Sequence, residues 1–350
     1  LALPAQAQET EADDPPDIVQ NNDEALGEWL GTEWQWTRRI MDRHTLIIGG
    51  EYRENIRQHQ VNYDVVEPRA YALDSDHSSR TLGLFAQLEV ALLTNLVLNA
   101  GIRYDHYFDS FGGTVNPRLG LIYNPWKTGA FKLLYGEAFR APNAYEQFYY
   151  SEERAFAELK PETIRTCELI YEQYIARRYR CSLSGYYYTV KDLISQITTP
   201  EDELTFANVD GAHAAGAELE LEAKYDSGLM ARASYALQRT HDQNGNELTS
   251  SPRQLAKLNL IVPLYRDKLF SSLELQYQSS ARTLQGNHVK NFVTANFTLF
   301  SQKIVAGLEA SASIHNLFDQ RTGYPGAADH LQDVINQDGR SFRFKLTYRF

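Results

Sequence analysis

Long apolar runs are missing from this chain of 350 residues. No stretch of about 18 apolar residues occurs, so the sequence offers no candidate for a transmembrane helix. The mean hydropathy of −0.45 would suit a soluble protein. The strands of a membrane β-barrel alternate apolar and polar side chains, however, and their mean hydropathy is also low. The missing runs therefore exclude a helical membrane protein and leave a barrel open.

Basic residues and cysteines are also scarce. Lysine and arginine number 34 against 45 acidic residues, and a net charge of −11 argues against a nucleic-acid partner, which needs a basic face. The two cysteines are Cys167 and Cys181. If residues 176–179 form a tight turn between antiparallel strands, the two thiols lie on the order of 20 Å apart along the ladder, too far for a disulfide. We expect two free thiols without a redox or metal role.

Recognisable catalytic motifs are absent from the sequence as well. It contains no H-E-x-x-H, no G-x-S-x-G and no P-loop. The nine histidines are scattered, and His241-Asp242 lies in a polar stretch where solvation is the simpler interpretation. We therefore predict that the protein is not an enzyme and holds neither a cofactor nor a resident metal.

What the sequence does contain is strict alternation, seen most clearly in its last segment, 339–350. Phe342, Phe344, Leu346, Tyr348 and Phe350 alternate with polar residues up to the final position. Because successive side chains of a strand point to opposite faces, one face would be wholly apolar and the other polar. The closing strand of a membrane barrel needs this pattern, with lipid on one side and a wet lumen on the other.

The same alternation returns along the chain in about 15 segments, which we interpret as the strands of an all-β, antiparallel transmembrane barrel. The segments are joined by turns such as Asp226-Ser227-Gly228 and by long polar loops, for example 58–79 and 141–162. Short and long connections are expected to alternate without exception, with the short turns in the periplasm. The barrel would occupy residues 25–350, after a linker at 1–24 whose residues 1–7 are either the remnant of a signal peptide or a flexible linker.

The number of strands has a further consequence. Bacterial barrels have an even number of strands, so an odd number predicts one part of a larger barrel of roughly 22 strands. The first and last strands should then not be closed on each other. With Phe350 in the periplasm, the first strand would run inward from the outside.

Several motifs together carry a family resemblance. They are Phe85-Ala86-Gln87, Gly101-Ile102-Arg103-Tyr104-Asp105, Tyr135-Gly136-Glu137-Ala138-Phe139-Arg140-Ala141-Pro142-Asn143, Leu159-Lys160-Pro161-Glu162, Asn316-Leu317-Phe318-Asp319 and the terminal strand ending in Phe350. In their order and spacing, over roughly residues 80–350, they resemble TonB-dependent outer-membrane receptors.

The resemblance implies a location and a function. It implies the outer membrane of a Gram-negative bacterium and TonB-dependent uptake of a scarce nutrient, with a ferric siderophore as the first expectation and cobalamin, haem or a glycan as others. Implied partners are outer-membrane lipid, the small-molecule metal chelate, the barrel-assembly machinery and the TonB complex. The plug and the TonB box of the family are not recognisable in this sequence. A passive porin-type channel and a truncated surface receptor without transport remain alternatives.

Three sets of candidate functional residues follow. Charged residues expected to face the lumen, either to hold a plug or simply as solvated charges, are Arg103, Asp105, Glu137, Arg140, Glu168 and Glu172. Candidate ligand contacts in the aromatic loop 141–162 are Tyr145, Tyr149 and Tyr150, for which packing of the loop on itself is the alternative. Phe350 is the expected assembly signal, or else one more aromatic residue of the membrane interface.

Overall fold

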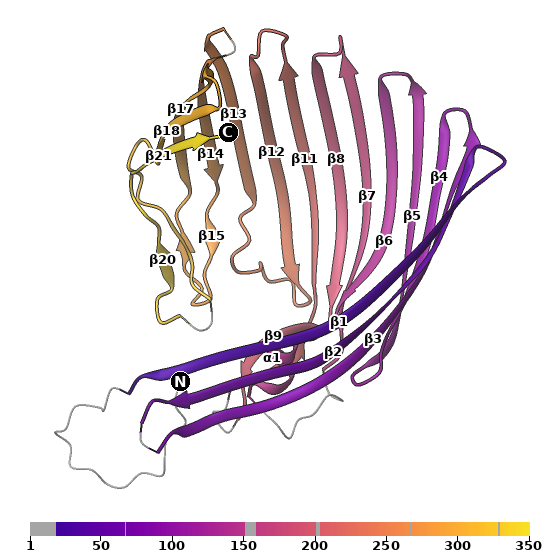
Figure 1. Cartoon of the computed structure of the whole chain (residues 1–350), viewed down its shortest axis with the longest axis vertical. Helices are drawn as coiled ribbons and strands as arrows, with labels where there is room; N and C mark the ends of the chain where they lie inside the picture. Colours follow the sequence, from indigo (N-terminus) through magenta and orange to yellow (C-terminus); the bar gives the residue numbers. More distant parts are fainter. Residues whose placement is uncertain (1–18, 67, 151–158, 201–203, 267, 328–329) are drawn as a thin grey trace.

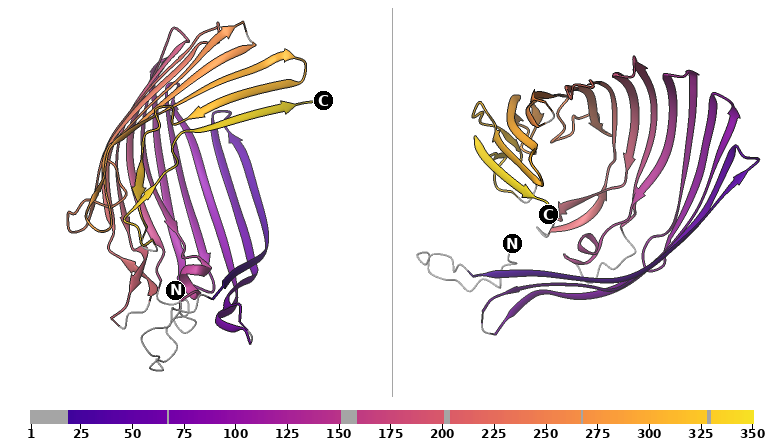
Figure 2. Two further views of the ribbon diagram at one scale, coloured as in Figure 1. Left: turned by 90° about the vertical axis from the view of Figure 1, so that its left-hand side faces the viewer. Right: turned by 45° about the horizontal axis from the view of Figure 1, so that its top comes forward.

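The computed structural model describes residues 19–66, 68–150, 159–200, 204–266, 268–327 and 330–350. Most of them belong to one 15-stranded sheet, in which every neighbouring pair is antiparallel. The sheet curls into an incomplete barrel (Figure 2). The predicted fold class is confirmed.

Neighbours in the sheet follow the order of the chain, with small hairpins inserted in the longer connections. The strands of the sheet, in spatial order, are β1 (Asn21–Ile40), β2 (His44–Asp64), β3 (Ala70–Leu93), β4 (Leu96–Tyr107), β5 (Gly112–Trp126), β6 (Gly129–Arg140), β7 (Glu162–Ile175), β8 (Tyr179–Lys191), β11 (Ala212–Lys224), β12 (Met230–Asp242), β13 (Gln254–Tyr265), β14 (Leu269–Gln278), β17 (Phe292–Val305), β18 (Leu308–His315) and β21 (Ser341–Tyr348).

The register explains why these residues form strands with two different faces. Directly paired residues share a face, and the pairs Leu98–Leu121, Leu121–Leu133 and Leu133–Leu169 continue one apolar row across β4, β5, β6 and β7. Large apolar side chains on this outer face are exposed, Phe344 by 80%. Such a surface suits lipid and would be unfavourable in water.

The strand β1 and the strand β21 form the two edges of the sheet and are not paired with each other in the part of the chain described here. The expectation of an unclosed sheet is thereby confirmed. Residues 1–18, which include the predicted signal remnant at 1–7, lie outside the described residues. The strand β1 already begins at Asn21, inside the segment 1–24 that the sequence indicated as a linker.

The two ends of the barrel differ in their connections. The end drawn lower in Figure 1 carries the helix α1 (Ala144–Phe148) and three small hairpins. These hairpins are β9 (Leu193–Thr198) with β10 (Leu204–Val209), β15 (Ala281–Arg282) with β16 (His288–Val289), and β19 (Gly323–Pro325) with β20 (Val334–Asn336). We call this the loop end. Among the described residues, no helix has the length and apolar character to cross a bilayer.

Two sequence-based expectations about the connections were wrong. The polar segment 58–79 is not a long loop, because β2 and β3 continue through it and pair from Gln58–His77 to Asp64–Ala70. Ion pairs such as Arg57–Asp76, with Nε and Oδ2 3.0 Å apart, join the two polar strands. Away from lipid both faces of a hairpin meet water, so a strand there needs no apolar alternation. The second wrong expectation is the strict alternation of short and long connections. The connection between β4 and β5 lies at the loop end, where a long one was expected, but it is short and comprises only 108–111.

Candidate functional site

A chain of ion pairs crosses five neighbouring strands on the inner face, toward the end with the short turns. The Nζ atom of Lys132 on β6 lies 2.7 Å from a carboxylate oxygen of Glu172 on β7. Arg180 on β8 donates to Glu172 at 3.0 Å and to Glu220 on β11, which also accepts from Arg232 on β12. Alternating signs leave each carboxylate between two cations. This chain fixes the inner wall of the barrel as a hydrated, charged surface.

A second inner cluster lies around Arg103. Its guanidinium donates to both carboxylate oxygens of Asp105 at 2.7–2.9 Å and also to Glu51 on β2. At the loop end, Arg140 donates to Glu146 of α1 at 2.8 Å and to Glu162 of β7 at 2.6 Å. Arg140 therefore ties the short helix to the rim of the barrel.

The register places one of the six expected lumen charges on the wrong face. Glu137 lies on the same face of β6 as Tyr135 and Leu133, which is the apolar outer face. Its partner in the register is Arg165 of β7, and the carboxylate of Glu137 lies 3.3 Å from Nε of Arg165. The guanidinium of Arg165 compensates this charge, and the pair lies close to the loop end, since β6 ends three residues later, at Arg140. The other five, Arg103, Asp105, Arg140, Glu168 and Glu172, share the inner face by their pairings.

The three candidate tyrosines are brought together at the loop end. Tyr145, Tyr149 and Tyr150 have ring centroids 4.4–6.0 Å apart, and Phe206 of β10 lies 5.6 Å from Tyr145. A capping box between Asn143 and Glu146 begins α1, which carries Tyr145 and ends just before Tyr149. We call these four residues the aromatic cluster.

Hydrogen bonds from distant strands hold the aromatic cluster in place. The hydroxyl of Tyr149 donates to Asp23 of β1 at 2.7 Å and accepts from Asn62 of β2 at 3.0 Å. Gln196 of β9 donates to the hydroxyl of Tyr150 at 2.9 Å. Partial burial, followed by the bond to Asp23, raises the pKa of Tyr149 to about 12. Burial also raises the pKa of Tyr145, so both phenols stay neutral at physiological pH.

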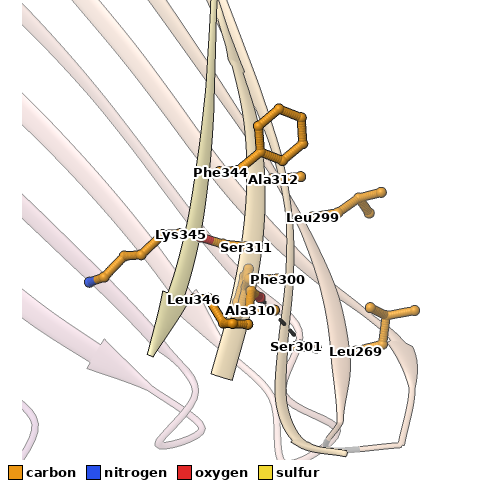
Figure 3. Close-up of a pocket in the computed structure, with 10 residues that line it drawn as sticks. All are labelled: Leu269, Leu299, Phe300, Ser301, Ala310, Ser311, Ala312, Phe344, Lys345 and Leu346. Atoms are coloured by element: carbon orange, nitrogen blue, oxygen red, sulfur yellow. Dashed lines mark hydrogen bonds between the residues drawn. The ribbon is translucent and has the colours of Figure 1, made fainter. Parts of the chain in front are cut away.

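The closing strand has the two faces that its sequence predicted. Phe344 and Leu346 of β21 point to one side with Leu299, and Lys345 points to the other side (Figure 3). Small Ala310 and Ala312 of β18 leave a shallow hollow between these larger side chains on the outer face. This hollow lies away from the loop end and belongs to the lipid-facing surface.

Over the described residues, no group of three histidine, cysteine or acidic side chains is arranged to hold a metal ion. Cys167 and Cys181 are both free thiols, as the sequence predicted. They lie on adjacent strands, paired with Tyr187 and Gln173 respectively.

Comparison with known proteins settles the family. The model of the TonB dependent receptor-like β-barrel matches residues 5–317. The chain belongs to this family. The recognition from sequence motifs is confirmed, and with it the location in the outer membrane of a Gram-negative bacterium.

Two curated relatives and one solved structure illustrate the range of TonB-dependent receptors to which the chain is similar. The vitamin B12 transporter BtuB of Vibrio cholerae is 26% identical over 66% of this chain and 38% of its own length. The ferric enterobactin receptor of Pseudomonas aeruginosa is 24% identical over 79% of this chain and 43% of its own length. The structure of P. aeruginosa FpvA bound to a heterologous pyoverdine superposes with a TM-score of 0.73 at 16% identity, over 97% of this chain and 51% of that chain. The chain thus spans less than half the length of these two curated relatives.

Within the TonB-dependent receptor barrel, the sequence missed several residues of the inner wall. Lys132, Arg180, Glu220 and Arg232 complete the ion-pair chain around Glu172. Each of the four alternates with apolar residues along its own strand, so the alternation could have placed it on the inner face. Pairing between strands was needed to show that the charges meet.

Proposed function

We propose that this chain forms the wall and outer mouth of a receptor for TonB-dependent uptake of a ferric siderophore. One observation carries the proposal: the loop end gathers Tyr145, Tyr149, Tyr150 and Phe206 into one cluster. Aromatic side chains combine a large apolar surface with a polar group and are enriched where proteins bind ligands. The named relatives are transporters and receptors, which supports a role in uptake and not in catalysis.

The cluster is suited to a rigid chelate because side chains from distant segments of the chain hold its rings in place. Asp23 of β1 and Gln196 of β9 hold the hydroxyls of Tyr149 and Tyr150. A platform fixed in this way loses little conformational entropy when a ligand binds. Transport through the barrel further requires the TonB complex and a plug inside the barrel, as the family resemblance implies.

Growth under iron limitation tests the proposal. The gene of the intact receptor is deleted and then restored, and growth is measured on a panel of ferric siderophores, with cobalamin and haem as other substrates. We expect loss and recovery of growth on at least one ferric siderophore. A strain that grows equally with and without the gene on every siderophore would refute siderophore uptake.

A variant series links the transport to the cluster. Tyr145→Ala and Tyr149→Ala should raise the siderophore concentration required for half-maximal growth. Tyr123→Ala, on the outer face of β5, is the matched control and should leave growth unchanged if the protein reaches the membrane in equal amount. An equal rise of this concentration in all three variants would contradict the assignment of siderophore binding to the aromatic cluster.

A further inference from the structure

Carboxylates border the aromatic cluster where it meets the long strands β1 and β2. In the pairing of these strands Asp23 lies opposite Asn62, and Asp64 lies two positions farther along the same face. Asp23 and Asn62 both bond to the hydroxyl of Tyr149, so this face is turned toward the cluster (Figure 1). Within the described residues, neither Asp23 nor Asp64 forms an ion pair. Their negative charges are therefore not compensated by a cation.

Arg140, the cation that ties α1 to the rim, is already neutralised by two carboxylates. Its guanidinium lies 2.8 Å from Glu146 and 2.6 Å from Glu162, whose side chains are only 10% and 15% exposed. All three guanidinium nitrogens donate to these two carboxylates. Arg140 with its partners thus carries a net negative charge, and its donors are not free to bind an anionic ligand.

The two segments that supply the aromatic cluster are acidic in sequence as well. The segment 192–211, which includes Phe206, has no lysine or arginine, and its acidic residues are Asp192, Glu201, Asp202, Glu203 and Asp210. The segment 141–161, which includes the three tyrosines, has Glu146, Glu152, Glu153 and Glu158 against Arg154 and Lys160. Both segments therefore carry a net negative charge.

The tyrosines of the cluster respond to these surroundings. Burial, followed by smaller effects of the neighbouring phenols and of Asp23, raises the pKa of Tyr145. An anionic ligand placed on these rings would meet the same loss of hydration and the same repulsion as an ionised phenol. A neutral ligand avoids both costs, and a cationic ligand is attracted by the faces of aromatic rings.

Given uptake of a ferric siderophore, we propose that the siderophore bound at the aromatic cluster is a neutral or cationic ferric trihydroxamate and not a tris-catecholate. Three hydroxamate groups carry one negative charge each and neutralise Fe³⁺, and an amine on such a chelator gives the complex a positive charge. Three catecholate groups carry two negative charges each and leave the complex with three. Aromatic rings bordered by carboxylates attract the first class and repel the second.

Growth on siderophores sorted by charge tests the proposal, in a strain that lacks other siderophore receptors and carries the intact receptor or none. The panel contains several neutral and cationic ferric trihydroxamates, among them ferrichrome and ferrioxamine B, and several tris-catecholates, among them ferric enterobactin. We expect receptor-dependent growth on at least one trihydroxamate and on no tris-catecholate. Receptor-dependent growth on a tris-catecholate or another anionic chelate would overturn the charge preference and leave siderophore uptake standing. Growth that is independent of the receptor on every siderophore would refute both.

Charge variants locate the preference. Asp64→Lys should raise the concentration of cationic ferrioxamine B required for half-maximal growth about fivefold, and should change that of neutral ferrichrome by less than about twofold. Asp74→Lys is the matched control, because Asp74 is paired with Val61, next to Asn62, and so lies on the opposite face of the same hairpin. Heat-modifiable mobility on gels confirms that each variant is folded. An unchanged requirement for ferrioxamine B in folded Asp64→Lys, or equal changes for both chelates, would contradict the role of these carboxylates.

Discussion

Arg180 lies between Glu172 and Glu220 and joins the carboxylates of two strands that flank its own. This one side chain converts separate pairs into a chain that runs from Lys132 to Arg232. Cross-strand ion pairs lock the register, and a slip of one residue would turn every side chain to the opposite face.

Removing Arg180 should loosen the inner wall. In Arg180→Gln, Glu172 and Glu220 each lose a partner but keep Lys132 and Arg232 respectively. We expect the free energy of unfolding to fall by about 1 kcal/mol after solvent screening, measured by urea unfolding of the full-length receptor in lipid vesicles. Lys257→Gln, an exposed inner-face cation on β13, should change it by less than about 0.5 kcal/mol. Equal stability of the two variants would contradict the role of Arg180.

The assignment of side chains of β11 to the outer and inner faces can be tested at two adjacent positions. Leu219 belongs to the outer face, and its neighbour Glu218 to the inner face, by their pairing with Leu183 and Ser184. Leu219→Arg should cost roughly 2–4 kcal/mol of folding free energy in a bilayer, because a charge then faces lipid. Glu218→Arg should fold with the parent's yield in the same vesicles. Equal yields of the two folded variants would contradict the assignment of faces.

The tyrosine titration should report the hydrogen bond between Tyr149 and Asp23. The pKa of Tyr149 is raised from 10.0 to about 12 by burial and by this bond. Because the pKa of Tyr149 is raised, the contribution of its neutral phenol to folding stability is complete below about pH 10. This contribution is lost as the pH rises through about 12. The absorbance difference between the parent and Tyr149→Phe should show this late titration. In Asp23→Asn the midpoint should move toward 10, and an unmoved midpoint would exclude Asp23 as a cause.

The last residue can be tested for a role in assembly. An unpaired strand edge attracts other strands, and its free backbone groups are costly in lipid. Deletion of Phe350 should lower the amount of receptor inserted in the outer membrane without changing its messenger RNA. Phe350→Tyr, which keeps the aromatic ring, should insert at the parent's rate. Equal insertion of the deletion variant would mean that Phe350 is only one more aromatic residue of the interface.

The aromatic cluster shows how far the residue pattern could lead. The sequence singled out Tyr145, Tyr149 and Tyr150 because one outer connection is rich in aromatic residues. It gave no sign of Phe206 or Asp23, which lie far along the chain and meet the cluster only because β1 and β10 fold toward α1. Contacts between distant segments depend on the curvature of the sheet and on how its hairpins fold at the loop end, which no local pattern records.

Most of the strands of the barrel and the faces of most of their residues were determined by sequence alone. Alternation with a period of two is a local property, and it predicted both the 15-stranded antiparallel sheet and the opposite directions of Phe344 and Lys345. Polar segments were harder, because in water neither face of a strand must be apolar, and 58–79 was therefore taken for a loop. Tertiary structure decided which charges meet. Glu137 pairs with Arg165 on the outer face and Glu172 with Arg180 on the inner face, because the register between strands, and not the order along one strand, brings two side chains together.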